Sequence, residues 1–268
     1  MKIGNREFDT KKHTYVMGIL NVTPDSFSDG GCWNQMDAAL RHTEEMIANG
    51  ADIIDIGGES TRPGYTMISD EEEISRVVPV IEKVKERFDI PVSLDTYKSS
   101  VAKAGIAAGA DLINDIWGLK YDDKMAGVIA ESKVACCLMH NRKEAVYTDF
   151  MEDMLKDLQE TLELADRAGI SRDKIMLDPG VGFAKTYENN LEAINRLEML
   201  HRLGLPILLG TSRKSVIALT LDLPKDQRVE GTLATTVLGV IKGAGFVRVH
   251  DVKENVRVIK MTEAIIGR

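Results

Sequence analysis

The sequence predicts an α/β fold, a closed (β/α)8 TIM barrel whose active site lies at the C-terminal ends of the strands. Short apolar runs alternate with longer stretches of helical periodicity along the whole chain. The length of 268 residues agrees with the roughly 250 residues that such a barrel usually takes. A doubly wound open sheet is the competing prediction, but its usual glycine-rich first turn, GxGxxG, does not occur in this sequence.

Apolar runs predict the eight strands, and each run is followed by a stretch that can form a helix, as a closed barrel requires. The expected strands lie near residues 15–20, 52–56, 90–94, 111–115, 134–139, 174–178, 206–210 and 245–249.

Helices are predicted between these runs. Apolar residues recur at helical spacing in residues 74–88 and again in residues 150–165. The first of these helices has a capping-box start formed by Ser69 and Glu72. Pro79 is expected either to kink this helix or to mark its true first turn.

Composition indicates a single globular domain. No linker, low-complexity segment or shift in composition divides the chain, so we expect one domain over residues 1–268, with residues 1–14 as a covering segment. The net charge of −8 argues against a general nucleic-acid surface, although a few local cations could still hold a small anionic substrate. No apolar run approaches the roughly 18 residues of a membrane span, and the start lacks the apolar region of a secretory signal. We expect a cytoplasmic protein.

Cysteines and histidines give no sign of a dedicated metal site. The three cysteines include the adjacent pair Cys136 and Cys137 but no CxxC motif. Because side chains alternate along a strand, these two are expected on opposite faces as small buried hydrophobic residues. Without an HxxxH motif or a carboxylate cluster, any metal is expected to be Mg²⁺ bound through a phosphorylated substrate.

Polar side chains mark the ends of nearly all predicted strands. The carboxyl ends of the strands form the active-site rim of such a barrel. A single polar residue there is commonly only a helix cap, whereas a full ring of them is harder to explain by capping. The residues at these ends are Asn21, Asp55, Asp95, Asn114, His140, Asp178, Lys214 and His250.

The triplet Arg248-Val-His250 places a guanidinium and an imidazole on the same face of the last strand. A rigid fork of donors beside a titratable donor suits a phosphate or diphosphate. The alternative is that Arg248 pairs with a carboxylate at the edge of the core, such as Asp251 or a neighbour.

Lys214 and two aspartates predict further binding functions. Lys214 opens a helix just past the seventh strand, where barrels often bind phosphate, although a lysine at a helix start is most often solvated. Asp95 and Asp178 lie in opposite sectors of the rim, and each could pair with a flat N–H edge of a ligand. A structural ion pair or a helix cap is the alternative for both.

Two long loops follow the first two strands. Residues 21–31 read NVTPDSFSDGG, which is longer than a connection that only turns the chain. Residues Gly57–Gly64 read GGESTRPG and would carry Thr61 and Arg62 toward a ligand.

Eight motifs in order resemble dihydropteroate synthase over nearly the whole chain. They are MGILNVTPDSFSDGG, DIGGESTRPG, SLDTYKSSVA, INDI, LMH, LDPGVGFAKT, LLGTSRKS and RVHDV. The resemblance implies an enzyme of folate biosynthesis that joins 6-hydroxymethyl-7,8-dihydropterin diphosphate to 4-aminobenzoate and releases diphosphate. Sulfonamides would mimic the second substrate. Because the implied chemistry breaks a C–O bond before the amine attacks, the loop at 21–31 is interpreted as a lid that excludes water.

The resemblance also implies the residue roles. The residues implied to hold the pterin are Asp95, Asn114, Asp178 and Lys214. Those implied to hold the diphosphate are Asn21, Thr61, Arg62, Arg248 and His250, with Asn21 also on Mg²⁺. Those implied to line the 4-aminobenzoate slot are Phe27, Thr61, Arg62, Phe183, Lys214 and Ser215. The residues implied to act in catalysis are Asp29, Arg62 and Lys214.

Two rival functions remain open from the sequence. A pterin-binding methyltransferase, which passes a methyl group from a folate to a corrinoid protein, would share the barrel but would not need a diphosphate clamp. A catalytically silent pterin-binding barrel should have lost loop residues such as Asp29, Thr61 and Arg62, which are present here. The resemblance further implies a homodimer formed through barrel helices.

Overall fold

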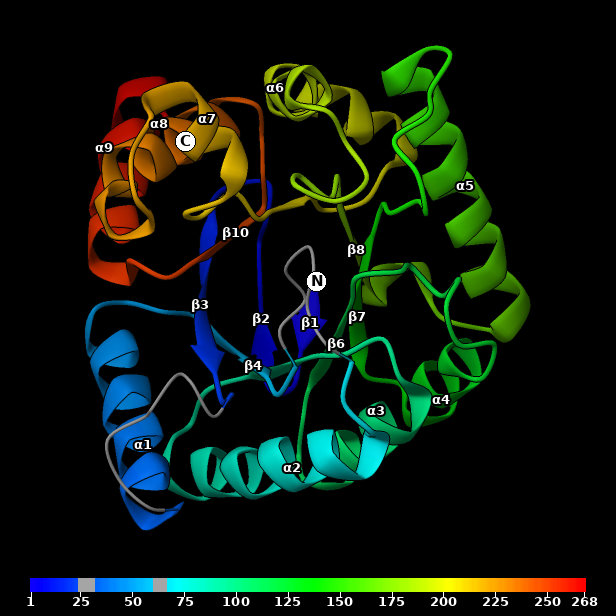
Figure 1. Ribbon diagram of the computed structural model, residues 1–268, viewed down its shortest axis with the longest axis vertical. Coiled ribbons are helices and arrows are strands. Elements are labelled where there is room, and N and C mark those ends of the chain that lie inside the picture. Colours follow the sequence, from blue (N-terminus) through cyan, green and yellow to red (C-terminus); the bar gives the residue numbers. More distant parts are fainter. Residues whose placement is uncertain (24–31, 60–66) are drawn as a thin grey trace.

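The computed structural model describes residues 1–23, 32–59 and 67–268, with the side chains of these residues except 32–35. Within them, eight parallel strands form one sheet in the order β8-β7-β6-β5-β4-β3-β10-β9. A parallel bridge between Leu177 and Ile207 joins the two outermost strands, which closes the ring. The predicted (β/α)8 barrel is confirmed (Figure 1). The strands are β3 (Tyr15–Asn21), β4 (Ile53–Gly57), β5 (Val92–Asp95), β6 (Leu112–Asp115), β7 (Ala135–Met139), β8 (Ile175–Asp178), β9 (Leu208–Leu209) and β10 (Phe246–Val249).

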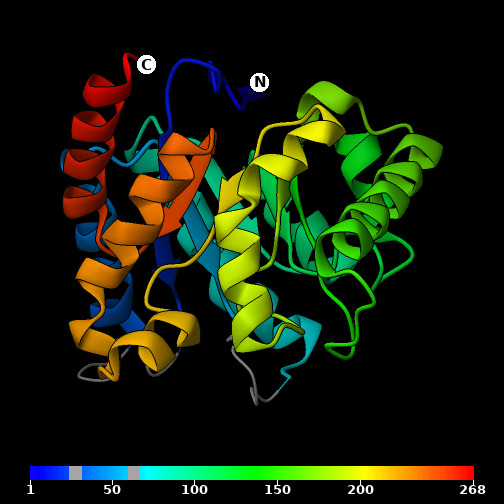
Figure 2. The same cartoon turned by 90° about the horizontal axis from the view of Figure 1, so that it is seen from above.

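Helices form an outer layer around the strands (Figures 1 and 2). They are α1 (Cys32–Ala48), α2 (Asp70–Arg87), α3 (Ser99–Ala107), α4 (Met125–Ser132), α5 (Phe150–Ala168), α6 (Tyr187–Asn195), α7 (Ser215–Leu221), α8 (Val229–Ile241) and α9 (Val252–Ile266). Short 3₁₀ segments are η2 (Arg172–Lys174), η3 (Leu197–Leu203) and η4 (Lys225–Gln227). No helix in the described part of the chain combines the length and apolarity needed to cross a membrane.

The start of α2 decides one of the two expectations for Pro79, and the expected kink stays a prediction. Ser69 is the N-cap, and its side chain accepts a hydrogen bond from the backbone N–H of Glu72 at 3.2 Å. The helix begins at Asp70, so Pro79 lies in its interior and the prediction that Pro79 marks the first turn is wrong. The acidic first turn, residues 70–73, is stabilised by the positive end of the helix dipole. Ser69 therefore decides where this helix begins.

Alternation along the strands divides the core into two parts. Outward-facing strand residues such as Ile54 and Cys136 pack against the helices, whereas inward-facing ones such as Ile53 and Cys137 fill the barrel interior. Cys136 and Cys137 are thus buried on opposite faces, as predicted.

An N-terminal hairpin lies at one end of the barrel (Figure 2). Its two short antiparallel strands are β1 (Lys2–Ile3) and β2 (Arg6–Glu7). Ile3 and Phe8 are buried with the interior residues Met17 and Phe246. Burial of these apolar side chains removes water from this end, which leaves the carboxyl ends of the strands for polar groups. The single-domain division stays a prediction.

Candidate active site

Strand pairing brings the polar strand ends together. In the register of the sheet, Asn21 is opposite Gly57, Gly57 is opposite Asp95, and Asp95 is opposite Asn114. Gly57 leaves space between its polar neighbours, since a Cβ there would lie 3.6 Å from the Cβ of Asp95 and 4.0 Å from Oδ1 of Asn21. The predicted ring of polar side chains therefore converges at the mouth of the barrel.

Arg248 is bound to two carboxylates in this mouth. Its Nε donates to Oδ2 of Asp55 and its Nη2 to Oδ2 of Asp95, both at 2.6 Å. Burial lowers the pKa of Arg248, but Asp55 and Asp95 raise it more, so the guanidinium stays charged. The structure therefore shows the alternative in which Arg248 pairs with carboxylates. Asp251, which the sequence offered as a partner, pairs with Arg213 instead. Two of the five guanidinium N–H groups are used in these bonds.

Asp95 has an unused oxygen in this arrangement. Among the described residues, no hydrogen-bond partner reaches its buried Oδ1. Burial raises the pKa of Asp95 to about 7; Arg248 lowers it, whereas Asp55 raises it further. Buried polar atoms are nearly always hydrogen-bonded, so an unpaired carboxylate oxygen at the mouth of the barrel indicates a place for a ligand's donor group.

Asp178 and Lys214 lie on the other side of the same space. A Cβ at Gly210 would lie 3.5 Å from Oδ2 of Asp178, 3.8 Å from Nζ of Lys214 and 3.9 Å from Cβ of Arg248. The absence of a side chain at Gly210 therefore keeps these three groups facing one space. Oδ1 of Asp178 accepts from the backbone N–H of Gly180 at 2.7 Å.

Lys214 is the N-cap residue of α7, as the sequence predicted for the start of a helix. Its Nζ donates to the carbonyl of Val181 at 2.5 Å and lies 4.8 Å from the ring centre of Phe183. Burial lowers the pKa of Lys214 to about 8, while the nearby Asp178 raises it. A lysine with this pKa can donate a hydrogen bond as an ammonium at neutral pH and release a proton with little cost.

Other predicted residues lie at the margin or outside the described part of the chain. Nδ1 of His250 is 3.0 Å from Oγ of Ser212. Ser215 is the exposed first residue of α7. The residues that fall outside the described chain are Phe27, Asp29, Thr61 and Arg62. The structure thus brings together Asp95, Asn114, Asp178, Lys214 and Arg248, with Asn21 beside them.

Two residues had no role in the sequence interpretation. Asp55 was recognised only as a strand end, yet it binds Arg248 and lies 3.5 Å from Nδ2 of Asn114. Lys185 belongs to the motif LDPGVGFAKT but was not singled out, and its Nζ lies 2.9 Å from Nδ1 of the buried His140. The feature of the sequence that points to Lys185 is its position, only seven residues beyond Asp178 at the end of a predicted strand.

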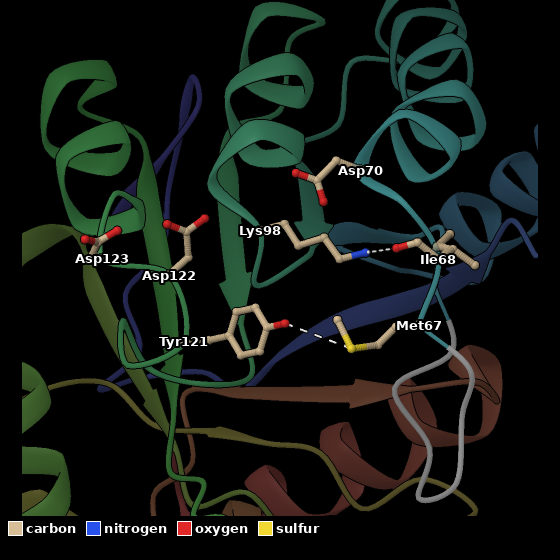
Figure 3. A pocket seen from close by; sticks show the side chains of 7 residues that line it. All are labelled: Met67, Ile68, Asp70, Lys98, Tyr121, Asp122 and Asp123. Atoms are coloured by element: carbon tan, nitrogen blue, oxygen red, sulfur yellow. Dashed lines mark hydrogen bonds between the residues drawn. The ribbon is translucent and has the colours of Figure 1, made fainter.

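A separate hollow of about 360 Å³ lies beside the start of α2 and α3 (Figure 3). Its lining is Met67, Ile68, Asp70, Lys98, Tyr121, Asp122 and Asp123. The one lysine in this lining is bound to Glu59 at 2.6 Å and to Glu73 at 2.8 Å, and its Nζ also donates to the carbonyl of Ile68. With its cation already paired and three aspartates around it, this hollow does not suit an anionic substrate.

Comparison with known proteins agrees with this geometry. The family described as pterin binding enzyme matches residues 17–250, so fold and site define a pterin-binding barrel. The chain is 62% identical to the dihydropteroate synthase of Clostridium beijerinckii over 269 aligned residues, which cover 100% of both chains. The chain belongs to the dihydropteroate synthase family, whose members are transferases of folate biosynthesis.

Solved structures agree in detail. A Clostridium difficile dihydropteroate synthase crystallised with pteroic acid superimposes with a TM-score of 0.95 at 51% identity, covering 98% of this chain and 100% of that one. A Yersinia pestis dihydropteroate synthase with a sulfonamide drug gives a TM-score of 0.94 at 42% identity, covering 100% and 99%. The family and the barrel expected from the sequence are confirmed.

Proposed function

We propose that this enzyme joins 6-hydroxymethyl-7,8-dihydropterin diphosphate to 4-aminobenzoate and releases diphosphate. The observation that carries the proposal is the buried Oδ1 of Asp95, which has no hydrogen-bond partner within the described chain and belongs to a strand end beside Asn114. In the reaction, the C–O bond to diphosphate breaks, a C–N bond forms, and the amine loses a proton.

The pterin would bind through its flat polar edge. That edge offers adjacent N–H donors and a carbonyl acceptor, which carboxylate, amide and ammonium groups can match. Asp95 and Asp178 would accept N–H groups, while Asn114 and Lys214 would contribute donors. Because Lys214 is half-buried and its pKa is lowered to about 8, it can supply a proton-bearing donor next to the ring.

The diphosphate would bind on the β10 side of the mouth. Arg248 is fixed by Asp55 and Asp95 and keeps further N–H groups for oxygen atoms of a ligand. His250 and Asn21, together with Thr61 and Arg62 from the loop after β4, would complete the clamp. A preorganised cation that stabilises the departing diphosphate would lower the barrier to C–O cleavage.

Mg²⁺ is the metal we propose for this site. Within the described residues, no group of three His, Cys, Asp or Glu side chains could hold a metal unaided. A Cβ added at Gly57 would lie 4.0 Å from Oδ1 of Asn21 and 3.8 Å from Oδ2 of Asp95, so these two oxygens lie near one another. Amide and carboxylate oxygens are the ligands that Mg²⁺ prefers. The ion would take Asn21 as a ligand and complete its shell with diphosphate oxygens, and it would neutralise charge on that leaving group.

The 4-aminobenzoate would bind against the start of α7. Phe183, Lys214 and Ser215 lie around this point, and Phe27, Thr61 and Arg62 are the loop residues proposed to cover it. A sulfonamide would occupy the same slot. Asp29 and Arg62 are proposed to act with Lys214 in the chemical step.

We also propose a homodimer and a cytoplasmic location. Large apolar side chains are exposed on α7, α8 and α9, which lie side by side (Figures 1 and 2). The exposed fractions are 68% for Leu219, 55% for Ile241, 61% for Met261 and 71% for Ile265. Sedimentation of the protein and of an Ile265→Glu variant tests this face, since a charge there should produce monomers.

A diphosphate-release assay tests the function. The protein is mixed with the dihydropterin diphosphate and Mg²⁺, with and without 4-aminobenzoate. Release that depends on 4-aminobenzoate is expected. A methyltransferase or a silent pterin-binding barrel would release none, although either could still bind the pterin.

A further inference from the structure

The loop between β8 and α6, residues 179–186, has an unusual backbone. Gly180, Gly182 and Ala184 have φ angles of +69°, +88° and +42°. Ala184 is not a glycine, so this conformation needs contacts that hold it. Gly180 is required on two grounds, because a Cβ there would also lie 2.0 Å from the carbonyl oxygen of His140. We call residues 179–186 the Phe183 loop.

Two side chains from other elements and one from the loop itself bind the carbonyls of the Phe183 loop. Lys214 donates to the carbonyl of Val181 at 2.5 Å, and Tyr147 donates through its hydroxyl to that of Ala184 at 2.8 Å. Lys185, within the loop, donates to the carbonyl of Phe183 at 3.0 Å. The loop is therefore held on both sides of Phe183, whose ring contacts Lys214.

A chain of hydrogen bonds fixes Lys185 in turn. Nζ of Lys185 lies 2.9 Å from Nδ1 of His140, and Nε2 of His140 lies 2.9 Å from Oδ2 of Asp157 on α5. Arg142 binds both oxygens of Asp157, at 2.5 and 3.1 Å, and lies over the ring of Tyr147. With Nε2–H donating to Asp157, the other ring nitrogen of His140 is left as an acceptor for Lys185.

The charges around His140 favour this proton arrangement. The pKa of His140 is lowered to about 4, chiefly by burial and also by Lys185 and Arg142, while Asp157 opposes the shift. The imidazole is therefore neutral near pH 7. Burial lowers the pKa of Lys185 to about 7, opposed by Asp178 and Asp157 and assisted by Lys214 and Arg142. Each member of the chain Lys185, His140, Asp157 and Arg142 thus has a defined partner. None of the four belongs to the site described above.

We propose that Lys185, held by His140 and Asp157, is a positioning residue that fixes Phe183 against Lys214 and so sets the affinity for the arylamine substrate. This inference rests on the proposed function, in which Phe183 lines the 4-aminobenzoate slot. The pterin side of the mouth is formed by Asp95, Asn114 and Asp178. In the described part of the chain Lys185 hydrogen-bonds to His140 and Phe183 and to none of these three side chains, and Asp178 acts on it only through its charge. Loss of the clamp should therefore act on one substrate and spare the other.

Steady-state kinetics of Lys185→Met test this separation. The KM for 4-aminobenzoate should rise about tenfold, because a charge-assisted hydrogen bond that orders the slot is lost. The affinity for a pterin analogue, measured by calorimetry, should stay within about twofold of the wild type. Lys143→Met is the matched control, since Lys143 is an exposed lysine in the neighbouring β7–α5 loop. It should leave both quantities unchanged.

Two substitutions of His140 separate positioning from mere packing. His140→Asn places an amide oxygen near the former Nδ1 and can still accept from Lys185, whereas His140→Gln places its amide near Nε2 and mainly preserves the contact with Asp157. The KM for 4-aminobenzoate should rise more in the Gln variant than in the Asn variant. Thermal unfolding of both variants checks that they fold.

Three outcomes would overturn the inference. They are an unchanged KM for 4-aminobenzoate in Lys185→Met, an equal loss of pterin and arylamine affinity, and equal behaviour of the two folded His140 variants. Failure of the proposed function would look different, because the wild-type protein itself would then release no diphosphate.

Discussion

Two buried clusters, each of one cation and two carboxylates, differ in the surroundings of their one unbonded carboxylate oxygen. In the Lys98 cluster, Lys98 binds Glu59 at 2.6 Å and Glu73 at 2.8 Å. In the Arg248 cluster, Arg248 binds Asp55 and Asp95, both at 2.6 Å. The side chain of Lys98 is 6% exposed and that of Arg248 is 19% exposed.

The difference lies in the remaining polar atoms. In the Lys98 cluster, the hydroxyl of Tyr97 donates to Oε1 of Glu59, and the Lys98 ammonium also donates to the carbonyl of Ile68. Each cluster has one buried carboxylate oxygen without a hydrogen bond among the described residues. In the Lys98 cluster it is Oε2 of Glu73, which still lies 2.8 Å from the Lys98 ammonium. In the Arg248 cluster it is Oδ1 of Asp95, whereas Arg248 binds the other oxygen, Oδ2. The same composition thus suits a structural anchor in one place and the proposed ligand site in the other. Contact of the unbonded oxygen with the cation, more than the number of charges, separates the two.

The largest expected effect comes from breaking the Lys98 cluster. Lys98→Met leaves two buried carboxylates without a cation, which should lower the free energy of unfolding by about 3–5 kcal/mol. Urea denaturation measures the loss. Lys103→Met, at an exposed position on α3, is the control and should change stability little. A loss below about 1 kcal/mol for Lys98→Met would mean that the cluster is not an anchor.

Arg248→Ala should lower both activity and stability, because it also leaves two buried carboxylates without their cation. Removing a preorganised cation from the leaving-group site should lower kcat/KM by about 10²–10³-fold. Arg248→Lys keeps the charge but not the fork of donors, so it should restore stability better than activity. If Arg248→Lys were as active as the wild type, the bidentate geometry would have no role in binding diphosphate.

Asp178→Asn tests the opposite side of the mouth. It would replace the proposed charge-assisted hydrogen bonds to the pterin with neutral ones, so pterin binding should weaken by about 1.5–3 kcal/mol. The fold should survive because the residue lies at the rim. Calorimetry with a pterin analogue gives the affinity, and an unchanged value would remove Asp178 from the pterin site.

Asp95→Asn should produce the smallest effect and one of opposite sign. The pKa of Asp95 is raised from 3.8 to about 7 in the folded protein. Its ionised form therefore opposes folding fully above pH 7, and the penalty shrinks as the pH falls toward 4. An asparagine has no such penalty but gives up the ion pair with Arg248, so the variant should be slightly more stable than the wild type at pH 8 and less so at pH 5.

Urea denaturation at both pH values measures this change, with Asp123→Asn at an exposed position as the control. A variant that is less stable than the wild type at pH 8 would show that the ion pair with Arg248 outweighs the burial of Asp95. Pterin binding by the same variant should weaken, because stability and function are opposed at this residue.

Local sequence determined most of the barrel. All eight strands occur within about two residues of their expected positions, since parallel strands covered on both faces read as apolar runs. The same alternation placed Cys136 and Cys137 on opposite faces and brought Asp95, Asn114 and Asp178 to one rim. These features depend on periodicity and on the direction of the strands, which neighbouring residues specify.

Tertiary structure alone decided which polar groups meet. Arg248 pairs with Asp55 and Asp95 across 193 and 153 residues of sequence, and not with the adjacent Asp251. Lys185 reaches His140 from a different loop. The Arg248 pairs arise because the last strand closes against the first, so the register of the closed barrel sets them. Sequence predicts that a rim is polar because that is a local property; it does not predict which oxygen stays unpaired, because that depends on the positions of all its neighbours at once.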